Sequence, residues 1–352
     1  MRSQGGTAAG PPYRVVQWAT GNIGSRTLRA TIQHPQLELA GVYVHTPAKA
    51  GRDAGDLCGL PPVGVAATDD IEEILALGAD CVLYTPRELD VDVLCRLLAS
   101  GTDVVTTRTD FHHRDRLDPT LREPVESACR KGASSLHSTG SSPGFITEAI
   151  PLVLSSIQRR LDSLLIEEYA NLSRRDSPAL LFEVMGFGRP PTEFDAGRVQ
   201  GLGASFGPSL RLVADTLGIR LDGIEASGEV ACARSHIRIA AGTIEPGTVA
   251  AQRITVAGVR DGHPVLRFRA NWYCGTDLDR DWDLRSTGWH VTLDGDAPLD
   301  IDIRFPVPPE KLAAVSPSYT ANRAVNAVPY VCQAPPGIRT TTDLPQIVAA
   351  LG

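Results

Sequence analysis

The sequence is poor in lysine and has no cysteine spacing that would mark a disulfide framework or a zinc site. Only three of its 34 basic residues are lysines, so few candidates exist for lysine-dependent chemistry. The seven cysteines are odd in number, scattered, and never spaced C-x-x-C. Such cysteines are typical of free thiols in a reducing cytoplasm. We therefore expect a cytoplasmic protein without a metal centre.

The sequence also lacks a basic surplus and a long apolar run. The formal net charge is −7 and the pI is near 5.6, which argues against nucleic acid or an anionic membrane surface as a partner. No apolar run approaches the roughly eighteen residues that span a bilayer. Residues 1–12 contain one arginine and no apolar core, so we interpret them as a disordered tail and not a secretory signal.

The remaining composition is that of a globular protein, 42% hydrophobic and 21% charged. At 352 residues the chain exceeds one ordinary core, so two domains are expected. Up to about residue 144, short β-rich runs alternate with segments of helical apolar spacing, which predicts an α/β domain with a doubly wound parallel sheet. Strands with hairpin connections then prevail, for example around "RDGHP" at residues 260–264. They predict a second, α+β domain with a mostly antiparallel or mixed open sheet.

The stretch "VVQWATGNIG", residues 15–24, has the pattern of a strand, a tight turn and a helix start. It places Ala19, Gly21 and Gly24 at the three positions of the G-x-G-x-x-G dinucleotide fingerprint. In that turn the first glycine permits the tight bend, the second lets the backbone approach a pyrophosphate, and the third allows close helix–strand packing. Alanine is the mildest replacement for the first.

Because this motif joins the first strand to the first helix of a βαβ unit, it indicates the cofactor turn of a Rossmann domain. A purely structural turn is the alternative. The residues expected to hold the cofactor here are Ala19, Thr20, Gly21, Asn22, Ile23 and Gly24. We expect the Rossmann domain over residues 13–145, a substrate-binding and dimerising domain over 146–315, and a segment, 316–352, that returns to the Rossmann domain.

The residues at the end of the second predicted strand indicate which cofactor is preferred, NAD or NADP. An acid about twenty residues beyond the glycines would bind the ribose 2′-hydroxyl of NAD. The sequence has His45, Thr46 and Lys49 there, and no acid until Asp53. A hydroxyl and basic groups suit a 2′-phosphate better. NADP is therefore the preferred cofactor and NAD the second choice, while a solvated loop is the alternative interpretation of these residues.

Hydroxyl groups follow the fourth and fifth predicted strands. The carboxyl ends of parallel strands form the ligand crevice of such a sheet. We therefore expect contacts with the cofactor's ribose or nicotinamide from Tyr84, Thr85, Thr106 and Thr107. Taken alone, these segments are ordinary loops.

Four motifs together carry a family resemblance. They are "WATGNIG" (18–24), "STGSSPGF" (138–145), "EEYANLSRRDSPALLFEVMGFG" (167–188) and "ANRAVNAVPYVCQAPPG" (321–337). The chain resembles the dihydrodipicolinate-reductase-like oxidoreductases, and most closely the branch of 2,4-diaminopentanoate dehydrogenase and the NAD(P)-dependent amine dehydrogenases. The resemblance implies a Rossmann domain, an α+β domain that forms a homodimer through its open sheet, and hydride transfer between the nicotinamide and a C–N carbon.

Two departures from the family's patterns concern the substrate. Dihydrodipicolinate reductases carry a His-His-x-x-Lys run, where this sequence has Ala170 and Asn171, with Arg174 and Arg175 near the lysine place. That enzyme's substrate is therefore not expected. The second departure concerns the amine-dehydrogenase branch, in which a pair of acidic residues follows the fifth strand.

In this sequence the two positions of that acidic pair are occupied by Thr109 and Asp110, so only one of them is acidic. We expect Asp110 to be the catalytic carboxylate, which would stabilise an ammonium or iminium and shuttle its proton. An exposed turn or helix-cap aspartate is the alternative.

The resemblance also suggests pocket residues. Phe145 and Tyr169 match aromatic positions that shape a small apolar pocket, together with Gly140 and Ser141 of the preceding turn. Asn326 falls in a helix that resembles a cofactor-facing segment. Core packing is the alternative for the aromatic residues, and a buried, satisfied asparagine is the alternative for Asn326.

These observations predict an NAD(P)-dependent oxidoreductase acting on C–N bonds. It would aminate small aldehydes or ketones reductively, or deaminate amines oxidatively. A carbonyl or cyclic-imine reductase that works without ammonia is the first alternative. A non-catalytic protein that senses NADP is the second.

Overall fold

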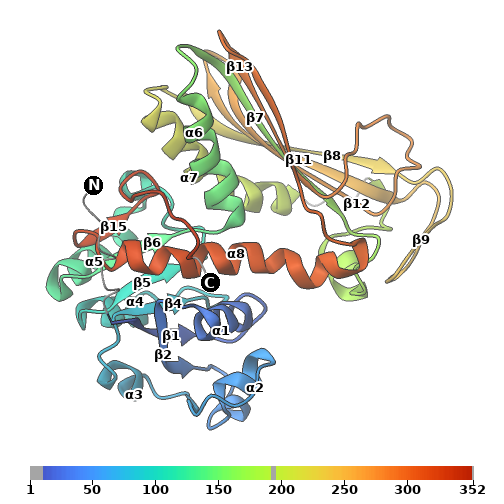
Figure 1. Cartoon of the computed structure of the whole chain (residues 1–352). Coiled ribbons are helices and arrows are strands. Elements are labelled where there is room, and N and C mark those ends of the chain that lie inside the picture. The colour runs from blue at the N-terminus through green and yellow to red at the C-terminus, as the bar shows by residue number, and fades with distance from the viewer. Residues whose placement is uncertain (1–10, 192–195, 351–352) are drawn as a thin grey trace, which may run out of the picture. The chain divides into compact units, whose positions relative to one another are not determined.

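The computed structural model describes residues 11–191 and 196–350 (Figure 1). Most of the expected N-terminal tail therefore lies outside the described residues. The chain divides into two compact units. Unit 1 consists of Met1–Gly140 together with Pro317–Gly352, and unit 2 of Ser141–Ser316.

Unit 1 is built on a seven-stranded sheet in which every neighbouring pair is parallel. The strand order is β15-β6-β5-β4-β1-β2-β3. The strands are β1 (Tyr13–Trp18), β2 (Leu37–Tyr43), β3 (Ala67–Thr68), β4 (Cys81–Tyr84), β5 (Asp103–Thr106), β6 (Ser135–Ser138) and β15 (Gly337–Arg339). The expected doubly wound parallel sheet is confirmed.

Helices cover both faces of this sheet, because its strands are apolar on both sides. Val16 and Val104 pack with residues of α4 and α5 on one face. Val15 and Val105 pack on the other face with the C-terminal part of α8, drawn in red in Figure 1. The helices are α1 (Gly24–Gln33), α2 (Ala54–Cys58), α3 (Ile71–Ala76), α4 (Val91–Ala99), α5 (Pro119–Gly132) and α8 (Pro309–Val331), with short 3-10 turns η1 (Pro47–Lys49) and η2 (Arg114–Arg116).

Unit 2 contains a six-stranded mixed sheet of order β14-β13-β7-β12-β11-β8. Only β7 and β12 pair in parallel, and the other neighbours are antiparallel. The strands are β7 (Leu161–Asn171), β8 (Gly223–Cys232), β11 (Val249–Arg260), β12 (His263–Tyr273), β13 (Gly288–Gly295) and β14 (Leu299–Arg304), and a separate two-stranded sheet contains β9 (Ile237–Ile239) and β10 (Gly242–Ile244). The predicted hairpin joins β11 to β12, with Asp261 and Gly262 at φ 52° and 74°.

One face of the unit 2 sheet packs against helices. Ile166 and Phe268 pack with Leu210 and Val213 of α7 (Ala196–Thr216), which lies alongside the sheet in Figure 1. The other helical segments are η3 (Ser141–Ala149), α6 (Ile150–Ser155) and η4 (Ala179–Val184). The opposite face carries the polar side chains described below. The described helices include none with the length and apolar character of a membrane span.

Candidate cofactor and substrate sites

The glycine turn after β1 has the geometry that its three key positions require. Ala19 adopts φ +71°, in the left-handed region that glycine favours, at a cost of about 1–2 kcal/mol for an alanine. A Cβ on Gly24 would lie 2.1 Å from the carbonyl oxygen of Ala19, so only glycine lets α1 begin this close to the strand. A Cβ on Gly21 would meet nothing within 4 Å. The turn is therefore tight on its inner side and open at Gly21.

A buried polar network holds this turn. Gln17 is fully buried in β1, and its Nε2 donates to the carbonyl of Ala19 at 2.8 Å and to Thr85 Oγ1 at 2.9 Å. Its Oε1 accepts from Thr27 Oγ1 of α1 at 2.6 Å. Our sequence analysis missed Gln17. A polar residue inside an otherwise apolar buried strand was the available signal.

The N-terminus of α1 suits an anionic group. Its first turn contains no acidic residue, and the isoleucine at its N-cap, Ile23, makes no side-chain capping hydrogen bond. The N–H groups of Ser25 and Arg26 donate to the carbonyls of Gly21 and Ile23. Asn22 is turned to the surface, where its Oδ1 accepts from Arg26 at 2.7 Å. Because the helix dipole favours negative charge at this end of α1, the turn fits the pyrophosphate of a dinucleotide.

The segment after β2 brings basic groups beside the turn. Lys49 donates its Nζ to both the carbonyl and the Oγ1 of Thr20, each at 3.1 Å. His45 and Thr46 are exposed. Asp53, the first acid, is committed to the main chain, since it accepts from the N–H groups of Gly55, Val63 and Gly64.

A pocket of about 600 Å³ opens at the carboxyl ends of β2 and β4. It is lined by His45 and by residues 86–92, which follow β4. The pocket therefore lies at the same edge of the sheet as the glycine turn. This edge is where a Rossmann sheet receives its ligand.

Three of the hydroxyl residues predicted for the cofactor stabilise this frame. Tyr84 is buried, and its hydroxyl accepts from the Asp90 N–H at 3.3 Å. Thr106 is fully buried and donates to the Tyr84 carbonyl at 2.7 Å. Thr85 donates to the Trp18 carbonyl at 3.0 Å. Thr107 follows β5 and is half-buried.

Asp110 forms an ion pair that the sequence analysis did not foresee. Nε of Arg108 donates to Asp110 Oδ2 at 2.8 Å, and the two side chains are 20% and 30% exposed. Nη1 of Arg108 also donates to the carbonyl of Arg87 at 2.6 Å, and Ser138 Oγ donates to the carbonyl of Arg108. The carboxylate is therefore held in one place by a guanidinium that joins the loops after β4 and β5.

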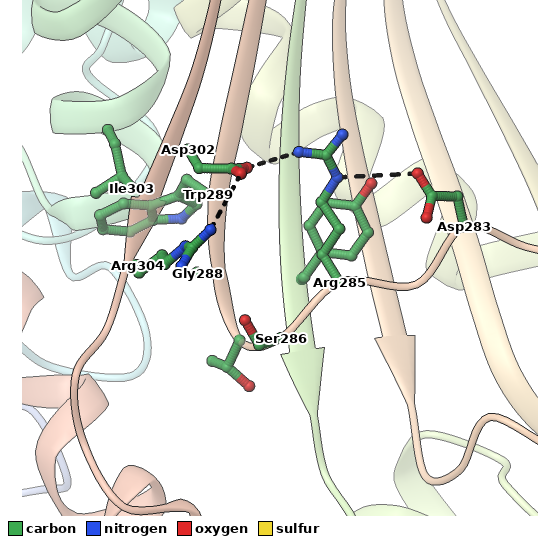
Figure 2. A pocket seen from close by; sticks show the side chains of 10 residues that line it. Asp283, Arg285, Ser286, Gly288, Trp289, Asp302, Ile303 and Arg304 are labelled. Atoms are coloured by element: carbon green, nitrogen blue, oxygen red, sulfur yellow. Dashed lines mark hydrogen bonds and ion pairs between the residues drawn. The ribbon is translucent and has the colours of Figure 1, made fainter.

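The predicted pocket residues fall on both units. Gly140 ends unit 1 and Ser141 begins unit 2. Phe145 packs against Trp289, with 6.0 Å between ring centroids. Tyr169 is buried and lines a pocket of about 290 Å³ in unit 2. Figure 2 shows Asp302 of this pocket between two arginines, and Arg285 donates to it at 2.6 Å.

Next to Tyr169, a network of charged side chains runs across neighbouring strands of the unit 2 sheet. Arg269 donates to Glu167 Oε1 at 3.1 Å, and His290 Nδ1 lies 3.4 Å from Glu167 Oε2. His290 Nε2 lies 2.9 Å from Asp300. Burial alone would raise the pKa of Glu167, but Arg269, His290 and Tyr169 together hold it below its usual value. Burial and the neighbouring Glu167 raise the pKa of Tyr169.

Asn326 of α8 lies beside His34, to which its side chain hydrogen-bonds. His34 follows the last residue of α1, so Asn326 is at the end of α1 opposite to the glycine turn. This position favours the structural interpretation of Asn326. The described residues contain no cluster of His, Cys, Asp and Glu that would hold a metal ion.

Comparison with known proteins gives consistent matches along the chain. Residues 145–352 match the family model of the 2,4-diaminopentanoate dehydrogenase C-terminal domain, and residues 15–124 match that of the dihydrodipicolinate reductase N-terminus. An amine dehydrogenase of Streptomyces virginiae is 31% identical and covers 94% of this chain and 95% of its own. A 2,4-diaminopentanoate dehydrogenase of Acetoanaerobium sticklandii is 22% identical over 80% of this chain and 81% of its own.

The solved structure of an amine dehydrogenase from Mycobacterium smegmatis shares the fold. Its TM-score is 0.75, with 22% identity and coverage of 97% of this chain and 98% of that one.

Proposed function

This chain belongs to the 2,4-diaminopentanoate dehydrogenase family, and on that premise we propose that it is an NAD(P)-dependent oxidoreductase of C–N bonds. It aminates small aldehydes or ketones reductively, or deaminates amines oxidatively. One observation carries this proposal. The carboxylate of Asp110, which pairs with Arg108, follows β5 at the sheet edge that also presents the glycine turn.

The residues present fit the cofactor. The backbone at Gly21 and the N-terminus of α1 would bind the pyrophosphate, and the pocket beside His45 would receive the adenosine half. Lys49 places a positive charge beside Thr20 on the turn, and Asp53 is committed to the main chain. These contacts support NADP over NAD. The bound dinucleotide supplies the hydride donor or acceptor.

Asp110 acts at the substrate nitrogen. Its negative charge stabilises an ammonium or iminium in the crevice, and its carboxylate accepts and returns the nitrogen's proton. Arg108 orients it through Oδ2. Phe145 and Tyr169 are proposed to shape the substrate pocket.

The Arg108 pair also favours the second candidate function. A guanidinium 2.8 Å from the carboxylate competes with a substrate cation for its charge. A carbonyl or cyclic-imine reductase that works without ammonia would not depend on that charge.

The assembly and location are proposed on separate grounds. We propose a homodimer that forms through the sheet of unit 2. Helices pack on one face of this sheet, so the opposite face, which carries the Glu167 pairs, is the face left for a second copy. Sedimentation that gives a monomer mass would contradict it.

A cytoplasmic location is supported by seven free cysteines.

The deciding experiment follows oxidation of NADPH and NADH with a panel of small aldehydes and ketones, with and without ammonia. Turnover that requires ammonia supports the proposed function. Turnover without it supports the reductase alternative. Tight NADPH binding with no turnover across the panel would indicate a sensor and contradict both.

Two variant pairs test the roles of individual residues. Asp110→Ala should lower turnover by about 10²–10⁴-fold and leave the NADPH dissociation constant unchanged. Asp115→Ala is the matched control, because Asp115 follows the same strand but its side chain is 68% exposed. Replacing His45 and Lys49 by neutral residues should raise KM for NADPH and spare NADH. An equal rise for both cofactors would contradict the preference for NADP.

A further inference from the structure

Two thiols and a carboxylate meet at the edge of the unit 1 sheet opposite to the glycine turn. Cys81 is the first residue of β4 and Asp103 the first of β5, and the two are paired across the strands. Cys332 directly follows the last residue of α8. We call these three residues the thiol cluster. None of them belongs to the proposed cofactor or substrate site.

The two thiols are neighbours in the core of unit 1. Cys81 and Cys332 pack in the same apolar cluster between α8 and the sheet, and their side chains interact with one another. The Cys332 thiol also faces the carboxylate of Asp103 and lies 4.0 Å from the carbonyl of Asp80. Cys81 is fully buried, whereas Cys332 is half-buried. A dissolved oxidant therefore reaches Cys332 first.

The surroundings of the pair assign a role to each group. Burial raises the pKa of Asp103 to about 6, although the Ser135 N–H donates to it at 2.6 Å. At neutral pH Asp103 is thus mainly a carboxylate, and the Cys332 thiol donates a hydrogen bond to it. Burial raises the pKa of the Cys81 thiol well above its usual value, so Cys81 is protonated at neutral pH and is not the first of the two thiols to react.

We propose that Cys81 and Cys332 form a peroxide-sensitive disulfide site that links the end of α8 to β4. The Cys332 sulfur attacks the peroxide, the O–O bond breaks, and sulfenic acid and one water form. The Cys81 sulfur then attacks the Cys332 sulfur, the S–O bond breaks, and the leaving hydroxide takes the Cys81 proton as a second water. The two thiols lose two electrons in total, and hydrogen peroxide accepts them.

The test maps the cysteines of the full chain after brief exposure to hydrogen peroxide. Free thiols are alkylated, and the non-reduced digest is analysed by mass spectrometry. We expect one linked pair of peptides that contain Cys81 and Cys332, lighter by two hydrogen atoms and separated by a thiol reductant. Sulfinic acid at Cys332 with Cys81 still alkylated would overturn the proposal. Equally rapid oxidation of the half-buried Cys58 and Cys95 would do so too.

Variants identify the order of the two steps. In Cys81→Ala, the sulfenic acid at Cys332 has no thiol to react with, so dimedone should trap it. In Cys332→Ser, Cys81 should stay reduced under the same exposure. Cys58→Ser is the matched control, because Cys58 is equally half-buried, and it should form the linked pair as the parent chain does. Oxidation of Cys81 in Cys332→Ser would show that Cys332 is not the entry point.

Discussion

The two large sheets of this protein bury polar side chains in opposite ways. In unit 1 the network at the glycine turn is neutral, since an amide, Gln17, joins hydroxyls such as that of Thr85. In unit 2 the network is charged and joins Glu167 to Arg269 and His290. Neutral groups that are all hydrogen-bonded cost little when buried, whereas a buried charge depends on its partner.

The two networks differ because different groups lie beside them. The N-terminus of α1 is offered to an anion, and any carboxylate in its frame would compete with that anion. An amide holds the turn equally well without a charge. No anion site is proposed beside these strands of unit 2, so carboxylates can form ion pairs there that join β7 to β12 and β13. The following substitutions test this contrast between the two networks.

Glu167→Ala should give the largest loss of stability. Removing this carboxylate leaves Arg269 partly buried without its partner, and we expect a loss of about 3–5 kcal/mol in the free energy of unfolding. Chemical denaturation followed by circular dichroism measures it. Asp162→Ala removes an exposed ion pair of the same strand and should cost no more than about 1 kcal/mol. Equal losses in the two variants would contradict the importance of the buried network.

Gln17→Ala should cost less stability but should affect the cofactor. It removes the donor to the Ala19 carbonyl and leaves buried hydroxyls with fewer partners, so we expect a loss of about 1–3 kcal/mol. The loosened turn should also raise the dissociation constant for NADPH, measured by fluorescence titration. Gln33→Ala, on the exposed end of α1, is the control. A variant with lower stability and unchanged NADPH binding would remove Gln17 from the cofactor frame.

Acid should weaken unit 2 through Glu167. Its folded pKa is below the unfolded value, which is about 4.3. Its contribution is therefore complete above that value and is lost as the pH falls through the folded pKa. We expect Glu167→Gln to make the acid-side decline of unfolding free energy shallower than in the parent chain. Parallel declines would show that Glu167 does not titrate differently on folding. The effect is smaller than that of Glu167→Ala, because the side chain remains.

Ala19→Gly should have the smallest effect and the opposite sign. Glycine relieves the left-handed strain but gains freedom in the unfolded chain, so we expect stabilisation of at most about 1 kcal/mol. Ala133→Gly is a matched control, since Ala133 also has a positive φ, at the end of α5. Only Ala19→Gly should alter NADPH binding. Destabilisation by Ala19→Gly would show that the alanine is preferred in this turn.

The parallel sheet of unit 1 was predictable because strands buried on both faces read as short continuous apolar runs. The hairpin at Asp261 was predictable because the Asp-Gly pair needs no distant partner. The pairing of Arg108 with Asp110 depends on how the loop after β5 folds, which local pattern does not reveal. The Glu167 network depends on the register of strands whose paired residues are more than a hundred positions apart along the chain. The position of Asn326 depends on which face of α8 packs against α1.

The division of the chain has a consequence for biosynthesis. Unit 2 is continuous, whereas unit 1 combines the first 140 residues with Pro317–Gly352. On the ribosome, the early strands of unit 1 emerge long before α8 can cover Val15 and Val105 and before β15 can pair with β6. Unit 2 can therefore complete its fold first, although its chain begins later. Until α8 emerges, the apolar face of the unit 1 sheet that it covers stays exposed, and such exposed apolar surface favours aggregation of the incomplete chain.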